Sequence, residues 1–198
     1  MRSRPIRFLT AALVAAPCAW TAVQGFGFVR FTAALESGVI DDAWTTAPGL
    51  ASLALDAQLR GAADGADLDT LRRREDRLTR LLAIKPGASR AWLSLAATRD
   101  SLNAPQAGID AAFVMSGVTG PAEGVLMAER SLLGILLWEK ASRDVHARTL
   151  TDLCGLSAFD PWKIRLVMTT KTAAVRTDIR AGLEAHNCSP ATIKTVGL

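Results

Sequence analysis

Apolar side chains recur every three or four residues along most of the chain from residue 50 onward, which is the spacing of one face of an α-helix. Sustained alternation of apolar and polar residues, which would indicate strands, is missing from the sequence. Prolines and glycines interrupt the helical pattern at intervals. The pattern therefore predicts an all-α fold, with helices over residues 50–59, 67–84, 89–103, 105–116, 123–138, 144–154 and 172–186.

Two of these segments need a separate comment. The run from Leu132 to Trp138 is apolar on almost every side, so we expect the helix that contains it to be central and buried. Residues 162–170 allow two interpretations. Asp160 and Pro161 are typical of an N-cap and a first helical turn, whereas the β-branched residues from Ile164 onward also suit extended chain. A short turn is expected at the C-terminus.

Residues 8–29 carry no charged side chain. As a helix rising about 1.5 Å per residue, such a stretch measures about 33 Å and can cross a hydrocarbon core of about 30 Å. Arg2, Arg4 and Arg7 precede the stretch and Arg30 follows it, so the positive-inside rule places the N-terminus in the cytoplasm. We therefore expect residues 1–30 to be a signal anchor that crosses the inner membrane once, with the body in the periplasm.

A cleavable signal peptide has the same composition and stays open as an alternative. A strong small-residue cleavage site is missing, since Val23-Gln24-Gly25 is a poor candidate and Pro17 disfavours cleavage after Ala16. Cys18 follows that proline, which fits a lipoprotein signal badly. The body is exported on each of these interpretations.

The basic charge of the chain belongs to its N-terminal segment. Residues 1–30 hold four arginines and no acidic residue, which accounts for the whole net charge of +4 and leaves residues 31–198 neutral. A neutral body argues against nucleic acid as a partner. Five arginines between Arg72 and Arg80 can contact anionic lipid or polysaccharide, but Glu75 and Asp76 partly neutralise them, and a solvated helix face is the favoured interpretation.

Cys154 and Cys188 are the two cysteines outside the apolar segment. In an oxidising compartment they can form one disulfide that ties the C-terminal helix to the preceding part of the chain. Two buried cysteines that never meet are the alternative. We divide the chain into the signal anchor at 1–30, a juxtamembrane helical region at 31–66 and a helical domain at 67–198.

Pro86 and Pro121 lie 35 residues apart and enclose a predicted pair of helices. After the first proline, Trp92, Leu95 and Ala96 occupy the tryptophan, leucine and small-residue positions of a tetratricopeptide repeat. Residues 70–121 resemble one such repeat unit and its join to the unit before it. The resemblance implies a stack of helical hairpins, or α-solenoid, with a concave face for protein partners.

The repeat pattern is degenerate in its second helix. Gly108 and Ala112 stand where the family usually has alanine and a large aromatic residue, and Phe113 is displaced by one position. Beyond Pro121 the repeat positions are not occupied in register. Exported and anchored proteins with such repeats resemble accessory factors of envelope or exopolysaccharide assembly, and this class is what the resemblance implies for function.

The sequence offers little for catalysis. His146 and His186 are its only histidines, and no spacing typical of a zinc site connects them with the cysteines. Cys154 lies eight residues after His146, but we assign this pair no catalytic role. His186 is better explained by its favourable placement in the dipole field near a helix C-terminus. We expect no cofactor, no metal, no small-molecule substrate and no enzymatic activity.

Two functions remain in view. The first is a membrane-anchored periplasmic scaffold that binds another envelope protein through the concave helices, with Arg90, Arg99 and Asp100 as candidate partner-binding residues. The second is a secreted soluble helical enzyme or small-ligand-binding protein that forms after signal cleavage. A closed apolar pocket with converging polar groups would favour the second.

Overall fold

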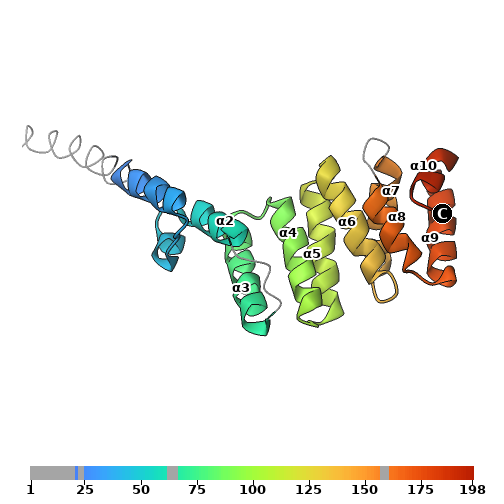
Figure 1. Cartoon of the computed structure of the whole chain (residues 1–198), viewed down its shortest axis with the longest axis horizontal. Coiled ribbons are helices and arrows are strands. Elements are labelled where there is room, and N and C mark those ends of the chain that lie inside the picture. Colours follow the sequence, from blue (N-terminus) through green and yellow to red (C-terminus); the bar gives the residue numbers. More distant parts are fainter. Residues whose placement is uncertain (1–20, 22–24, 62–66, 157–160) are drawn as a thin grey trace, which may run out of the picture. The chain divides into compact units, whose positions relative to one another are not determined.

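A computed structural model describes residues 21, 25–61, 67–156 and 161–198. The chain divides into two compact units, Met1–Ala63 and Asp64–Leu198, which are drawn in Figure 1 and are considered separately below. Within the described ranges the regular structure is helical and no strand occurs. The prediction of an all-α fold is therefore confirmed for the described residues.

The first unit is a small helical assembly. Its described part contains a helical segment over residues 25–37, the 3₁₀ helix η1 (Asp42–Thr46) and the helix α2 (Ala51–Gly61). Phe31, Leu50 and Ala54 form its core, and the ring of Trp44 lies 5.5 Å from that of Phe31. Gln58 on α2 donates hydrogen bonds to the carbonyl of Ile40 and to Asp42, which fixes the loop before η1.

The predicted membrane span lies largely outside the described residues. Residues 8–20 and 22–24 belong to the stretch that the structure does not describe. Among the described helices, none combines the length and the apolar character that crossing a bilayer requires. The anchor therefore stays a prediction.

The second unit contains eight helices in its described residues. Their bounds are α3 (Leu68–Ile84), α4 (Ser89–Ser101), α5 (Gln106–Thr119), α6 (Gly124–Leu137), α7 (Arg143–Gly155), α8 (Trp162–Thr169), α9 (Ala173–Ala185) and α10 (Pro190–Thr195). Residues 162–169 are helical, which decides between the two interpretations of that segment. The proposed cap Asp160 lies outside the described residues, and Pro161 stands at the N-cap position of α8.

Local sequence signals explain several helix ends. Asp67 caps α3 by accepting a hydrogen bond of 2.9 Å from the backbone N–H of Thr70. Hydrogen bonds from the Thr70 side chain and then from its backbone hold the pKa of Asp67 below its ordinary value. Asn103 and Asn187, which follow α4 and α9, adopt positive φ angles of 53° and 55°. Asparagine tolerates this left-handed conformation, which is common just beyond a helix C-terminus.

The contacts between the helices of the second unit arrange them in two layers, and Figure 1 shows the helices following one another from α4 to α9. α4 packs against α5, and α6 packs against α7, each pair being joined by a short turn. In addition α4 contacts α6 and α6 contacts α8, while α5 contacts α7 and α7 contacts α9. α4, α6 and α8 thus form one layer, and α5, α7 and α9 form the other. α3 packs against α4.

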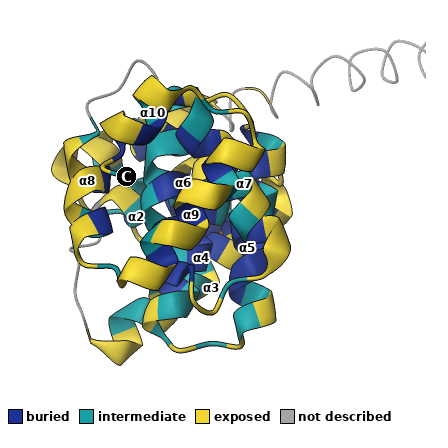
Figure 2. Cartoon of the chain, turned by 90° about the vertical axis from the view of Figure 1, so that its right-hand side faces the viewer, coloured by how far each residue is buried: buried dark blue, intermediate teal, exposed yellow. Residues whose placement is uncertain are grey.

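A hydrophobic core runs through the C-terminal half of this unit. Figure 2 shows its buried residues turned inward around α6, α7 and α9, with exposed residues on the outer sides of α8 and α10. α10 contributes Ile193 and Val196 to the core and so covers one end of it. The other buried members are Ile135, Trp138, Leu150, Leu153, Leu156, Ile164, Met168, Val175, Ile179 and Leu183.

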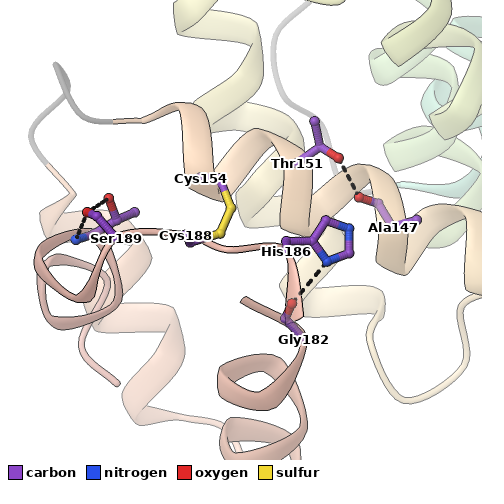
Figure 3. The surroundings of a disulfide bond; sticks show 8 residues. Ala147, Thr151, Cys154, Gly182, His186, Cys188 and Ser189 are labelled. Carbon is purple, nitrogen blue, oxygen red and sulfur yellow. Dashed lines mark hydrogen bonds between the residues drawn. A yellow bond between two sulfur atoms is a disulfide. The ribbon is translucent and has the colours of Figure 1, made fainter. Parts of the chain in front are cut away.

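A disulfide joins Cys154, near the end of α7, to Cys188, just before the N-cap of α10 (Figure 3). The two Cα atoms are 5.3 Å apart, which lies within the usual range for this bond. Beside it, His186 is the C-cap residue of α9, and its Nδ1 lies 3.0 Å from the carbonyl oxygen of Gly182. The bond fastens the turn between α9 and α10 to α7.

Candidate partner-binding surface

The three residues that the sequence analysis proposed for partner binding all lie on α4. Arg90 occupies its first turn, and its guanidinium Nη1 lies 3.3 Å from Oε1 of Glu129 on α6. The side chain of Arg90 is 63% exposed and that of Glu129 is 41% exposed, so this ion pair lies on the outside of the molecule. It links neighbouring helices of the α4, α6 and α8 layer.

Arg99 and Asp100 are engaged with other helices as well. The Nε of Arg99 lies 2.8 Å from Oε1 of Glu75 on α3, and its Nη1 donates to the carbonyl of Gly108 on α5. Asp100 forms an ion pair with Lys140, which follows α6. The structure therefore places the three candidate residues in three separate ion pairs, and Arg90 is the most exposed of them.

α6 presents an apolar stripe that the sequence analysis did not anticipate. Val125, Glu129, Leu132 and Leu136 follow one another at helical spacing and share one side of the helix. Val125 is 55% exposed and Leu136 is 51% exposed, so the expectation that this helix is central and buried holds for its inner side and fails for its outer side. The layers explain the difference, because α4 and α8 pack beside α6 while its outward side stays uncovered.

The neighbouring stripe on α4 begins with Arg90 and continues with small residues. Arg90, Ser94, Ala97 and Ser101 follow the same helical spacing and are exposed or half-buried. Since Glu129 of α6 reaches Arg90 of α4, the two stripes border each other at this ion pair. We call the two stripes together the α4–α6 surface.

A buried ion cluster holds α5, α6 and α7 in place behind this surface. Arg130 on α6 has no exposed side-chain surface, and neither has Asp152 on α7. Two parallel hydrogen bonds of 2.7 and 3.1 Å join the guanidinium to the carboxylate. The remaining Nη1 of Arg130 donates to the carbonyls of Ser116 and Gly120 at the end of α5. Arg148 donates a further bond to Asp152.

Trp138 connects the C-terminal end of α6 with α7 and α9. Its indole N–H donates a 2.8 Å hydrogen bond to Asp178 on α9, and its ring stacks on His146 of α7 with the centroids 4.0 Å apart. The Nε2 of His146 also lies 2.8 Å from the carbonyl oxygen of Trp138. The expectation that Trp138 is buried is confirmed, while Trp92 is only partly buried and donates to the carbonyl of Pro86.

Reactive groups in the described part of the chain have structural partners. Cys154 is bonded to Cys188, and His146 is held by Trp138. No cluster of three or more histidine, cysteine or acidic side chains that could hold a metal occurs in the described residues. A hollow of about 590 Å³ lies between α9 and α10, where the ion pair of Arg180 with Glu184 faces it. This hollow is open to solvent, unlike the closed apolar pocket that a small ligand prefers.

Comparison with known proteins does not assign the chain to a family. No protein-family model matches the chain, and no curated protein and no solved structure matches it either. The resemblance to tetratricopeptide repeats therefore stays a prediction, and function has to be argued from the residues described above.

Proposed function

We propose that the chain is a membrane-anchored periplasmic scaffold of the tetratricopeptide-like type, which binds another envelope protein through the α4–α6 surface. Its place would be that of an accessory factor in exopolysaccharide or envelope assembly. The observation that carries the proposal is the two-layer packing, because it leaves Val125 and Leu136 of α6 exposed beside Arg90 of α4. Helical-repeat proteins use surfaces of this kind to bind proteins.

The chemistry of the α4–α6 surface suits a protein partner. Val125 and Leu136 supply exposed apolar area, while Ser94 and Ala97 let a partner backbone approach α4 closely. The Arg90–Glu129 pair lies between the two stripes and offers both signs of charge. An apolar centre with a polar border is the usual composition of a specific protein interface.

A pair of matched variants tests the surface. Val125→Asp with Leu136→Asp places two charges in the apolar stripe, whereas Val118→Asp adds a charge to α5, where Val118 is 65% exposed. Each site is exposed, so we expect little change in the unfolding midpoint. Photo-crosslinking from position 132 in intact cells should capture an envelope protein with the native chain and with Val118→Asp. The double variant should lose that product, and equal capture by all three chains would refute the surface.

The location is tested independently of the partner. Alkaline phosphatase folds and works outside the cytoplasm, so a fusion placed after Ala63, at the end of the first unit, reports on which side of the membrane the body lies. We expect an active fusion that sediments with membranes. An inactive fusion would overturn the periplasmic assignment, and an active fusion found in the soluble fraction would overturn the anchor.

A further inference from the structure

The helical segment over residues 25–37 changes character within one turn. Phe26, Phe28 and Val29 are 66%, 51% and 63% exposed, although all three are large apolar side chains. Phe31, two residues later, is only 1% exposed and lies in the core of the first unit. The large apolar residues before Arg30 therefore face outward, whereas Phe31, directly after Arg30, packs inward.

One side of this helix faces the core of the first unit. Gly27 faces the core, since a methyl group at its Cα would lie 4.0 Å from Cδ1 of Leu50. Phe31 points to the same side, because four residues complete about one helical turn. Phe26, Phe28 and Val29 cover the opposite half of the circumference at about 100° per residue. These exposed apolar side chains thus surround the whole outer half of the helix.

The outward positions become small or polar one turn further along. Four residues after Phe26, Phe28 and Val29 stand Arg30, Thr32 and Ala33. Apart from Leu35, which lies seven residues after Phe28, the large apolar and the polar outward residues are thus separated along the helix axis. A docking face for another protein runs lengthwise at positions i, i+3, i+4 and i+7, whereas a change along the axis marks a planar boundary between apolar and aqueous surroundings.

The sequence before the segment indicates what lies on the apolar side. Residues 8–29 carry no charge, and the outward residues Phe26, Phe28 and Val29 are the last large apolar ones of that stretch. Arg30 follows directly, and its guanidinium carbon lies 6.0 Å from the centroid of the Phe26 ring. A side chain of this length can also extend to lipid phosphate groups. Leu35, 41% exposed, follows five residues later, about 7.5 Å along the helix and within the depth of a headgroup layer.

We propose that the outer surface of the hydrocarbon core lies at Arg30, so that Phe26, Phe28 and Val29 contact lipid acyl chains. The core formed by Phe31, Leu50 and Ala54 then begins directly above the lipid, and η1 and α2 lie against the headgroups. This inference rests on the proposed anchor and adds to it the depth of each residue. The ligand of the outer face is thus a lipid surface.

Site-directed spin labelling of the full chain in vesicles of phosphatidylcholine and phosphatidylglycerol tests the proposal. Cys18→Ser removes the third cysteine of the chain, and the Cys154–Cys188 disulfide stays intact. Single cysteines then replace Phe26, Phe28 or Val29, with Ala33 and Glu36 as controls on the same helix. Oxygen concentrates in lipid and a nickel chelate stays in water, so their relative collision rates with the label report its depth.

We expect oxygen collisions to dominate at positions 26, 28 and 29, and nickel collisions to dominate at 33 and 36. Low collision rates with both reagents at 28 and 29 would mean that a protein or a second copy covers them, and would overturn the proposal. Nickel access at 28 and 29 in a chain that floats with the vesicles would also overturn it while leaving the anchor intact. A chain that does not float with vesicles would refute the anchor itself.

Discussion

Arg130 is the most consequential single residue of the second unit, because a charged side chain with no exposed surface must find all its partners inside the protein. It finds a carboxylate on α7 and two carbonyls at the C-terminal end of α5. The Ser116 carbonyl also accepts from the backbone N–H of Gly120, so the guanidinium adds a second hydrogen bond there and caps the helix end at the Gly120 carbonyl. One side chain thereby fixes how three helices meet.

Removing the countercharge of this arginine should destabilise the unit strongly. Asp152→Asn keeps the size of the side chain but leaves the buried charge of Arg130 unpaired, which typically costs about 3–5 kcal/mol in the free energy of unfolding. Chemical denaturation measures the loss. Asp144→Asn, on the exposed first turn of the same helix, is the control and should stay within about 0.5 kcal/mol of the native chain. Equal effects of the two variants would contradict the role of the cluster.

The cap of α3 gives a prediction about pH. Hydrogen bonds from Thr70, its side chain first, hold the pKa of Asp67 below the ordinary value. A carboxyl group whose folded pKa is lowered stabilises the folded state above its unfolded pKa, and this contribution is lost as the pH falls through the lowered value. Thr70→Val removes the hydroxyl, so the pKa of Asp67 should rise toward its ordinary value in a carboxyl-carbon NMR titration.

The same variant has a consequence for stability. Native chain and Thr70→Val should differ in unfolding midpoint at neutral pH, and the difference should narrow as the pH falls into the acid range where Asp67 is protonated in both. Thr79→Val is the matched control, since its hydroxyl bonds only to the carbonyl of Glu75 on the exposed side of the same helix. If Thr79→Val raised the pKa of Asp67 as much as Thr70→Val does, the result would argue against the Thr70 contact as the cause.

At the scale of the elements, glycine decides how closely α6 and α7 approach. A Cβ atom on Gly134 would lie 2.0 Å from Oγ1 of Thr149 and 2.9 Å from its Cβ, which is closer than atoms can pack. Gly134→Ala should therefore push the two helices apart and cost about 1–3 kcal/mol in unfolding free energy. Gly108→Ala, where the nearest atom would be 3.6 Å away, should be neutral or stabilising. A thermal scan of both variants separates the contact from the loss of a helical glycine.

Most helices of the fold could be predicted from the sequence because their ends are marked by local chemistry. Asp67 begins α3, Pro105 precedes α5, and Asn187 closes α9 with its positive φ angle. These signals act over three or four residues and need no knowledge of the rest of the chain. Ser89 shows their limit. It matches a cap by residue type, but its hydroxyl instead donates to Glu123 at the start of α6.

The candidate site was less predictable, because exposure depends on which helices become neighbours. The run from Leu132 to Trp138 gave no indication that Leu136 would face outward while Ile135 and Leu137 are buried. Arg99 and Asp100 were proposed as partner-binding residues, but Arg99 pairs with Glu75 on α3 and Asp100 pairs with Lys140, which follows α6. Arg130 and Asp152 lie 22 residues apart, and nothing in their local sequence indicates a buried pair. The two-layer packing determines which helices are neighbours, and the pattern of apolar residues in the sequence does not contain this information.

For the molecule as a whole, the disulfide is a covalent constraint on the second unit. Cys154 and Cys188 are separated by 34 residues, and closing such a loop stabilises a fold by about 2–4 kcal/mol in most cases. A reducing agent should lower the unfolding midpoint of the native chain to that of the Cys154→Ser, Cys188→Ser variant. The variant itself should not respond to the reducing agent. A native chain that is insensitive to reduction would show that the bond carries no stability.

The same bond determines what a protease can release from the chain. α8 and α9 lie between Cys154 and Cys188, so one cut anywhere in that interval yields two fragments that remain covalently joined. Such a nicked protein would migrate as a single band on a non-reducing gel and separate only when thiols are added. A single proteolytic cut in this part of the molecule would therefore release no fragment as long as the disulfide stays oxidised.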